Sequence, residues 1–241
     1  MKPDMKKILN LKRDIRLEET NDKEYSLYIY GSIGGWFSEN NAETVRRKIH
    51  AIDAKKINVH INSGGGSAFD GVAICNLLKQ HKAEIIIYVD GWAASAASII
   101  AMAGDKIIMP ANTMMMIHQA STYEYGNADV FEKTAKDLRK IDAAIRQSYE
   151  KRFVGTEDEL VQLLKEETWL TADEAVALGL ADEVADEIEI DESQEENEEE
   201  VENAKNSIVA KYAAQVNSKN KPKEPEQEKP KANLSALFLN L

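Results

Sequence analysis

Residues 57–102 read INVHINSGGGSAFDGVAICNLLKQHKAEIIIYVDGWAASAASIIAM, and two kinds of pattern alternate along them. The segments at 57–61 and 84–89 are short and β-rich, and the second is almost continuously apolar, as in a strand buried on both faces. Residues 68–79 between them have the apolar spacing of a helix. A glycine-rich turn at 63–67 joins the first strand to this helix. Strand, helix and strand in this order predict two parallel strands joined by a crossover helix.

The same alternation continues on both sides of this segment. Upstream, residues 26–33 predict a strand and residues 41–52 a helix. Downstream we expect a small-residue helix within 92–102, strands at 106–109 and 113–118, a long amphipathic helix at 128–153, and helices at 157–164 and 173–178. The last of these helices begins at a capping box formed by Thr171 and Glu174 and ends before Gly179. Repeated alternation of this kind predicts an α/β fold with mainly parallel strands.

Charge divides the chain into a folded part and a tail. The 241 residues include 30 Lys and Arg against 42 Asp and Glu, for a net charge of −12. Residues 186–202 hold 11 of these acids and no base. Such a block repels itself and cannot bury a core. We therefore expect a flexible or assembly-dependent arm at 1–24, one folded domain at 25–185, and a disordered or partly helical tail at 186–241.

The composition excludes several classes of protein. The one cysteine, Cys75, excludes an intramolecular disulfide framework and a cysteine-based zinc site. No run of 18 apolar residues is present to span a membrane, and the charged first residues lack the apolar core of a secretory signal. An acidic chain of pI about 4.9 lacks the basic surface of a nucleic-acid-binding protein. We expect a cytoplasmic protein with no metal, cofactor, nucleic-acid partner or membrane partner.

Three places in the chain have residues suited to chemistry. The turn at 63–67 can offer backbone N–H groups to an anion or oxyanion, although a simple tight turn is the commoner interpretation. Ser95 follows Asp90 and Gly91 near an expected helix N-terminus, where developing negative charge is stabilised. A serine bonded to a backbone carbonyl is the alternative there. His118 ends a strand-like run and has the chemistry of a general base near neutral pH.

A carboxylate would orient such a histidine, but the residues by themselves do not choose one. The candidates within reach along the chain are Asp129, Asp142, Glu166, Glu167 and Asp173. The order serine, histidine, acid is compatible with a hydrolytic triad. Triads are recognised by geometry and not by order, so all five candidates stay open at this point.

Four separated motifs resemble the ClpP-type serine peptidases: INSGGGSAFDGVAICNLL at 61–78, VDGWAASAASIIAMAGD at 89–105, MIHQA at 116–120 and ETWLTADEAVALGLADEV at 167–184. The resemblance covers about residues 25–185 and is strongest to the ClpP-like head maturation proteases of tailed bacteriophages. It implies a ClpP/crotonase-like fold of repeated β-β-α units. It also implies a serine endopeptidase that acts on polypeptides as a homo-oligomeric ring, with ring-to-ring contacts along the helix at about 128–153.

The resemblance assigns roles to individual residues. The catalytic serine of the family falls on Ser95 and the catalytic histidine on His118. The oxyanion hole is similar to one built from the backbone N–H groups of Gly65 and Ala96. The usual SPGGS of the family is SGGGS here, with Gly64 in the proline position, which loosens the turn but keeps both following glycines.

The third catalytic position is where the sequence departs most from ClpP. The family's aspartate aligns with Glu167, which is one methylene longer but can still accept the histidine N–H, as in Ser-His-Glu triads. Glu166 and Asp173 are the alternatives. The phage relatives resemble this E-T-W form.

The expected substrate is an extended polypeptide that binds along the turn by β-augmentation, against Gly64, Gly66 and Gln119. The N-terminal region does not resemble the axial loop of housekeeping ClpP, and the tail suits a scaffold-like or self-processed extension. We therefore expect cleavage of a scaffold or capsid precursor in phage prohead maturation, in the cytoplasm of the host cell. The alternatives are an ATP-dependent Clp proteolytic subunit that works with an unfoldase and a degenerate protease that acts as an assembly scaffold.

Overall fold

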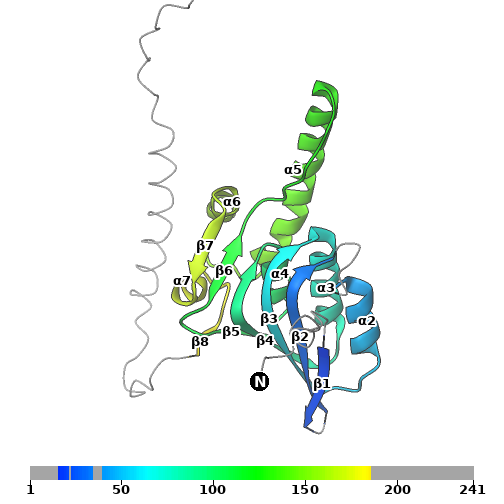
Figure 1. Cartoon of the computed structure of the whole chain (residues 1–241). Helices are drawn as coiled ribbons and strands as arrows, with labels where there is room; N and C mark the ends of the chain where they lie inside the picture. Colours follow the sequence, from blue (N-terminus) through cyan, green and yellow to red (C-terminus); the bar gives the residue numbers. More distant parts are fainter. Residues whose placement is uncertain (1–15, 22, 35–39, 186–241) are drawn as a thin grey trace, which may run out of the picture.

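The computed structural model describes residues 16–21, 23–34 and 40–185 (Figure 1). Strands and helices alternate along most of this part of the chain, and its strands form one mixed sheet. The strands are β1 (Arg16–Asn21), β2 (Glu24–Ile33), β3 (Lys56–Gly66), β4 (Glu84–Ala94), β5 (Lys106–Met109), β6 (Met114–Ile117), β7 (Thr168–Thr171) and β8 (Glu183–Val184). The helices are α2 (Ala42–His50), α3 (Ala68–Gln80), α4 (Ala96–Ala101), α5 (Ala128–Glu150), α6 (Glu157–Lys165) and α7 (Ala172–Ala177).

The strand order places β3 and β4 in the middle of the sheet. The order is β1-β2-β3-β4-β5-β8, and β6 pairs with both β4 and β7. The pairs β2–β3, β3–β4, β4–β5, β5–β8 and β4–β6 are parallel. Only the outer pairs β1–β2 and β6–β7 of this described sheet are antiparallel. The predicted α/β fold with mainly parallel strands is therefore confirmed.

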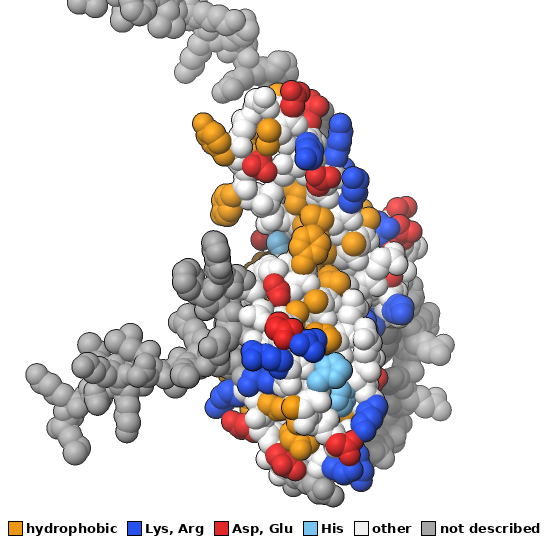
Figure 2. Space-filling view, turned by 90° about the vertical axis from the view of Figure 1, so that its right-hand side faces the viewer, with side chains coloured by type: hydrophobic (Ala, Val, Ile, Leu, Met, Phe, Trp, Pro, Cys, Tyr) orange, Lys and Arg blue, Asp and Glu red, His pale blue; other side chains and the backbone are white. Residues whose placement is uncertain are grey.

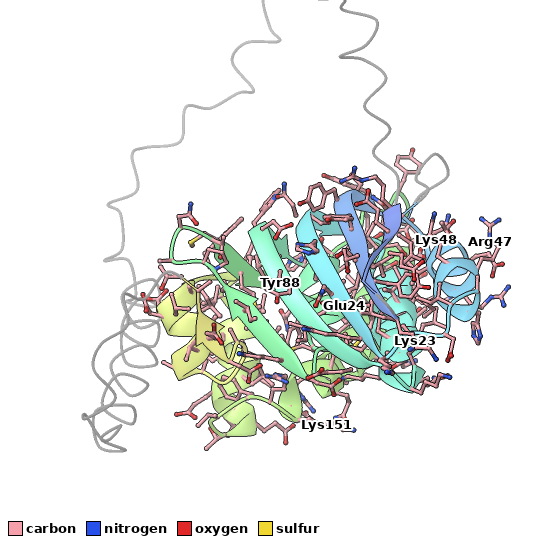
Figure 3. All side chains as sticks on the ribbon, turned by 90° about the horizontal axis from the view of Figure 1, so that it is seen from below. Lys23, Glu24, Arg47, Lys48, Tyr88 and Lys151 are labelled. Atoms are coloured by element: carbon pink, nitrogen blue, oxygen red, sulfur yellow. The ribbon has the colours of Figure 1, made fainter. Side chains whose placement is uncertain are left out.

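Alternating burial distinguishes the two faces of the sheet. Along β3, Ile57, Val59 and Ile61 are fully buried, whereas Asn58 and His60 between them are half-buried. Helices α3 and α4 contact β3 and pack against each other. In the view from below, α2 lies at one side of the domain, beyond β1 and β2 (Figure 3). The core therefore lies between the sheet and these helices.

The less buried face of the sheet carries stacked rings. His60 stacks between Tyr28 and Tyr88, with ring centroids 4.7 and 5.1 Å apart, and Tyr88 is labelled on the sheet in Figure 3. Asp90 accepts a hydrogen bond from the Tyr30 hydroxyl at 2.5 Å and lies 3.1 Å from His60 Nδ1. Burial and the Asp90 carboxylate both raise the pKa of Tyr30. These polar groups satisfy one another on the surface of the sheet.

The central strands are longer than the sequence pattern predicts. β3 continues through the glycines to Gly66, because Gly66 pairs with Ile33 of β2. β4 continues to Ala94, because residues 92–94 pair with β6. Helix α4 consequently begins only at Ala96, and all six of its residues are buried. The extra strand residues place residues 64–66 and Ser95 side by side.

The capping box predicted before the last helix is confirmed. The Glu174 N–H donates to Thr171 Oγ1 at 3.3 Å, and the Thr171 N–H donates to the Glu174 carboxylate at 3.0 Å. Gly179, the residue directly after the α7 C-cap Leu178, has a φ of +72° and ends this helical segment as expected.

Part of the expected N-terminal arm is a strand. β1 lies within residues 1–24 and pairs with the edge of β2, from Arg16 opposite Tyr28 to Asn21 opposite Glu24. Leu17 packs against the core, and the Arg16 guanidinium lies over the Tyr28 ring at 4.7 Å. One apolar side chain does not make a visible alternation, which is why the sequence shows no strand there. Residues 1–15 of the arm and the whole expected tail, 186–241, lie outside the described residues.

The order of elements does not confirm a β-β-α repeat throughout. Two consecutive strands precede a helix at β1-β2-α2 and at β5-β6-α5, but β3-α3 and β4-α4 are simple β-α units. The mixed α/β architecture stands, and the strict repeat remains a prediction from the family resemblance.

The tightest backbone approach in the sheet gives a prediction about stability. Gly66 has a φ of +148°, and a Cβ added there would lie 2.1 Å from the Ile33 carbonyl oxygen, which the β-ladder holds in place. We expect Gly66→Ala to lower the free energy of unfolding by at least about 2 kcal/mol. Denaturant unfolding would measure the change.

Gly64→Ala is the matched control for this prediction. The Cβ added at Gly64 would meet only the ring of Trp92, at 2.7 Å, and a side chain on the surface can shift. We expect a clearly smaller loss of stability for this variant. Equal unfolding midpoints for the two variants would contradict the argument.

Candidate active site

Ser95 stands at a sharp turn between the central strand and a buried helix. It follows β4 and caps α4, with φ of 56° and ψ of −123°. A non-glycine residue in this region is strained by about 1–3 kcal/mol, and such strain is concentrated at functional sites. The Ser95 N–H donates to the Met116 carbonyl at 2.9 Å, which fixes the turn to the neighbouring strand β6. A similar strained strand-to-helix turn exposes the nucleophile of many hydrolases.

His118 reaches Ser95 through strand pairing. It follows β6, and the β4–β6 register pairs Ala94 with Met116, so the residues after these two strands emerge together. His118 Nε2 lies 2.7 Å from Ser95 Oγ. A serine hydroxyl and a histidine nitrogen at this distance are arranged as a nucleophile and its general base. The two residues that the sequence predicts as catalytic are thus in contact.

The glycine turn lies directly against this pair. Gly65 has a φ of +90°, and a Cβ added there would lie 2.6 Å from the Ala94 oxygen, 2.7 Å from Ser95 Cβ and 2.9 Å from the Ala96 nitrogen. Any side chain at Gly65 would therefore occupy the space beside Ser95. The backbone of the turn, with no side chain, can approach a reacting carbonyl.

The two expected oxyanion donors are placed differently. Ala96 lines the pocket beside Ser95, as expected of a donor. The Gly65 N–H instead donates to Ser63 Oγ at 3.0 Å, and Ser63 in turn donates to the Gly31 carbonyl. Gly66 lines the pocket next to Ser95, whereas Gly65 is the glycine that lies closest to Ser95 and Ala96. The spacing of three glycines in the sequence does not show this arrangement.

A buried hydrogen-bond chain supports the backbone of Ser95 from the core side. Ser98 Oγ donates to the Ser95 carbonyl at 2.6 Å and lies 2.8 Å from the Tyr149 hydroxyl. Since the one Ser98 hydroxyl hydrogen goes to Ser95, the Tyr149 hydroxyl is the donor to Ser98. Both side chains are buried, and burial raises the pKa of Tyr149. Tyr149 belongs to α5, so this helix supports the strained turn.

A pocket of about 280 Å³ opens beside Ser95 and His118. Its wall is mainly apolar, with Ile99, Leu138 and Ile141 contributing from α4 and α5. Gly66 and Gln119 line it, as predicted for substrate contacts, whereas Gly64 lies outside this lining against the Trp92 ring. Figure 2 shows hydrophobic side chains gathered along this side of the molecule, below the protruding end of α5. A pocket of this size and lining suits an apolar side chain of a bound polypeptide.

The expected acid, Glu167, makes no hydrogen bond with His118 within the part of the chain that the structure describes. Ile117 pairs with Thr168 in the antiparallel β6–β7 ladder, so His118 and Glu167 lie opposite each other just beyond it. However, Glu167 has a φ of 52°, and its side chain is exposed. Its role as the acid stays a prediction from the resemblance.

The other candidate acids are spread around the domain. Asp129 and Asp173 are exposed in the first turns of α5 and α7. Glu166 caps the end of α6 and accepts a hydrogen bond from Gln162 at 3.4 Å. Asp142 is half-buried on α5, accepts the Ala120 N–H at 2.7 Å and lines a cavity together with His118. The sequence includes Asp142 among its candidates but offers no reason to prefer it.

Comparison with known proteins agrees with this geometry. A family model described as Clp protease matches residues 23–188, which is more than half of the chain. The chain belongs to the Clp protease family. Its similarity extends to the ATP-dependent Clp protease proteolytic subunit of Deinococcus radiodurans, with 27% identity over 186 residues that cover 71% of this chain and 91% of the relative. The protein is therefore a serine peptidase of the ClpP family.

The described residues provide neither a metal-binding cluster nor a membrane-spanning helix. They hold no group of three or more His, Cys, Asp or Glu side chains placed to bind a metal ion. Among the helices described, none has both the length and the apolar character needed to cross a bilayer.

The Ser98–Tyr149 chain yields a prediction about the nucleophile. Tyr149→Phe removes the hydroxyl that donates to Ser98 and leaves the ring in place. We expect a loss of about 1 kcal/mol in stability and slower reaction of Ser95 with a fluorophosphonate. Tyr123→Phe is the control, because Tyr123 is fully exposed. Equal labelling rates for the two variants would show that the chain does not support Ser95.

Proposed function

We propose that this Clp protease family member is a serine endopeptidase in which Ser95 is the nucleophile and His118 the general base. The observation that carries the proposal is the distance of 2.7 Å between His118 Nε2 and Ser95 Oγ. The strained backbone of Ser95 and the apolar pocket beside it support the same reaction. The proposal requires no metal or cofactor.

In the proposed mechanism, His118 Nε2 takes the proton from Ser95 Oγ as that oxygen attacks the peptide carbonyl. The negative charge that forms on the carbonyl oxygen meets the N–H groups of Ala96 and of the glycine turn, where Gly66 faces the pocket and Gly65 is the donor expected from the resemblance. His118 then gives its proton to the leaving amine. In the second half, His118 takes a proton from water as the water oxygen attacks the acyl-enzyme ester; the ester bond to Ser95 Oγ then breaks, and His118 returns the proton to that oxygen.

The substrate of this mechanism is an extended polypeptide. It would lie along the exposed backbone at Gly64 and Gly66, with Gln119 on the opposite side and an apolar side chain in the pocket of about 280 Å³. We also propose a homo-oligomeric ring, as the family resemblance implies.

The biological role that we propose is cleavage of a scaffold or capsid precursor during phage prohead maturation, in the host cytoplasm. The support for this role comes from the sequence. The E-T-W motif at 167–169 resembles the phage relatives, and the acidic block at 186–202 suits an assembly-linked or self-processed extension. A second candidate is a proteolytic subunit that works with an ATP-driven unfoldase, which is favoured by the similarity to the Deinococcus subunit over nearly its whole length.

The nucleophile can be tested directly. We expect a fluorophosphonate to label wild-type protein at Ser95, as located by peptide mapping, and Ser95→Ala to abolish the labelling. His118→Ala should slow it about 10²–10⁴-fold, because the hydroxyl loses its base. Assembled protein that is never labelled would refute the peptidase proposal and favour a degenerate protease that acts as a scaffold.

The two biological roles predict different substrates. In the prohead role, the wild-type protein by itself cleaves an unfolded capsid or scaffold precursor, and an added unfoldase with ATP does not change the rate. In the second role, degradation of a folded, tagged protein requires the unfoldase and ATP. Ser95→Ala is the control in both assays, and light scattering on the same samples reports the assembly state.

A further inference from the structure

We propose that Asp142 on α5 positions His118 in this chain, in the place that the family alignment gives to Glu167. The inference rests on the proposed function, because a positioning carboxylate has a role only if His118 is the general base. The two possible sources of the carboxylate that orients His118 are the middle of the long helix α5, where Asp142 lies, and the turn before β7, where Glu167 lies.

The first argument comes from the two cavities that meet at His118. The pocket that His118 shares with Ser95 lies on one side of the imidazole, the side of Nε2. A second cavity of about 160 Å³ is lined by His118 but not by Ser95, so it borders the histidine at a different place from the first pocket. Asp142 is the one carboxylate among the described residues that line this cavity. His118, whose Nε2 is already in contact with Ser95, and the half-buried acid therefore border the same space.

The second argument is that Asp142 is already fixed to the segment that carries His118. One carboxylate oxygen accepts the Ala120 N–H at 2.7 Å, two residues after the histidine. The Gln119 N–H between them donates to the Leu164 carbonyl at 3.1 Å, so the segment has little freedom to move away. Asp142, like Glu167, makes no hydrogen bond with His118 among the described residues, so we propose that its second carboxylate oxygen reaches the histidine through one water in the cavity or on substrate binding. Catalytic hydrogen bonds are often longer before substrate binds.

The third argument compares the two acids. Glu167 is exposed, so its charge is screened by solvent. Asp142 is half-buried and hydrogen-bonded, and a charge in that setting acts more strongly on its neighbour. Asp142 is therefore expected to stabilise a protonated His118 more strongly than Glu167 does.

The other charged groups around His118 do not cancel the attraction between Asp142 and a protonated His118. Arg139 and Arg146 line the same cavity from α5. Arg146 is paired with Glu150 and Glu157, each at 2.7 Å, and its charge is thereby balanced. Arg139 is exposed to solvent, as is Glu167 on the side of β7. Asp142 is thus the negative group best placed to stabilise the protonated histidine.

The test is the pH dependence of peptide hydrolysis and of fluorophosphonate labelling for wild type, Asp142→Asn and Asp142→Ala. Asp142→Asn keeps an oxygen for the Ala120 N–H but removes the charge. We expect kcat to fall about 10²–10⁴-fold with little change in KM, and the acid limb of the profile to move to lower pH, because the imidazolium ion loses its partner. Asp142→Glu, which restores the charge, should recover part of the rate.

Controls separate this role from a structural one. Asp137→Asn removes an exposed carboxylate one and a half turns earlier on α5 and should match wild type. If Asp142→Asn keeps the wild-type rate and profile while Asp142→Ala loses them, Asp142 only holds the loop, and the proposal is overturned. It is also overturned if Glu167→Gln produces the loss and profile shift that we assign to Asp142. If wild type is never labelled at Ser95, the proposed function itself fails, which is recognisable because no variant then differs.

Discussion

Strand β4 changes its partner halfway along its length, and the geometry of the site depends on this change. Residues 86–88 pair with β5, and residues 92–94 pair with β6. The second pairing carries β4 past the end of β5 and brings His118, just after β6, beside Ser95, just after β4. The hydrogen bond from the Ser95 N–H to the Met116 carbonyl continues the same ladder by one step. The proposed nucleophile and its base are therefore held by the main chain of the sheet, which positions side chains more exactly than loops do.

Small residues make this arrangement possible from the helix side. A Cβ at Gly71 of α3 would lie 2.9 Å from the Ala96 oxygen, so α3 and the start of α4 are in backbone contact. Gly65 approaches Ser95 and Ala96 from β3 just as closely. Protein interiors are close-packed, so a larger side chain at either glycine would displace α4 and the turn at Ser95 that precedes it. The small-residue composition of this region thus follows from the position of the serine.

Local patterns in the sequence predict most of this fold, because the strands and helices around the core have clear apolar spacing and recognisable ends. The motifs also identify Ser95 and His118, whose contact requires only that two parallel strands end together. Features set by distant contacts are not visible in this way. The lengths of β3 and β4 depend on their partners, and β1 has a single apolar contact. The roles that we propose for Gly66 and Asp142 depend on which residues line a cavity, and the spacing of residues along the chain does not show this.

The strand β1 has a consequence for what the sheet can bind. Without it the sheet would end at β2, a ten-residue strand whose free edge could accept any unfolded chain. β1 covers that edge with the sequence RLEETN, in which Arg16, Glu18 and Glu19 put charge on the new border. An incoming strand would have to strip water from these charges, which disfavours addition there. For a peptidase whose proposed substrates are extended polypeptides, the protected border leaves the glycine turn beside Ser95 as the more favourable place for a chain to align.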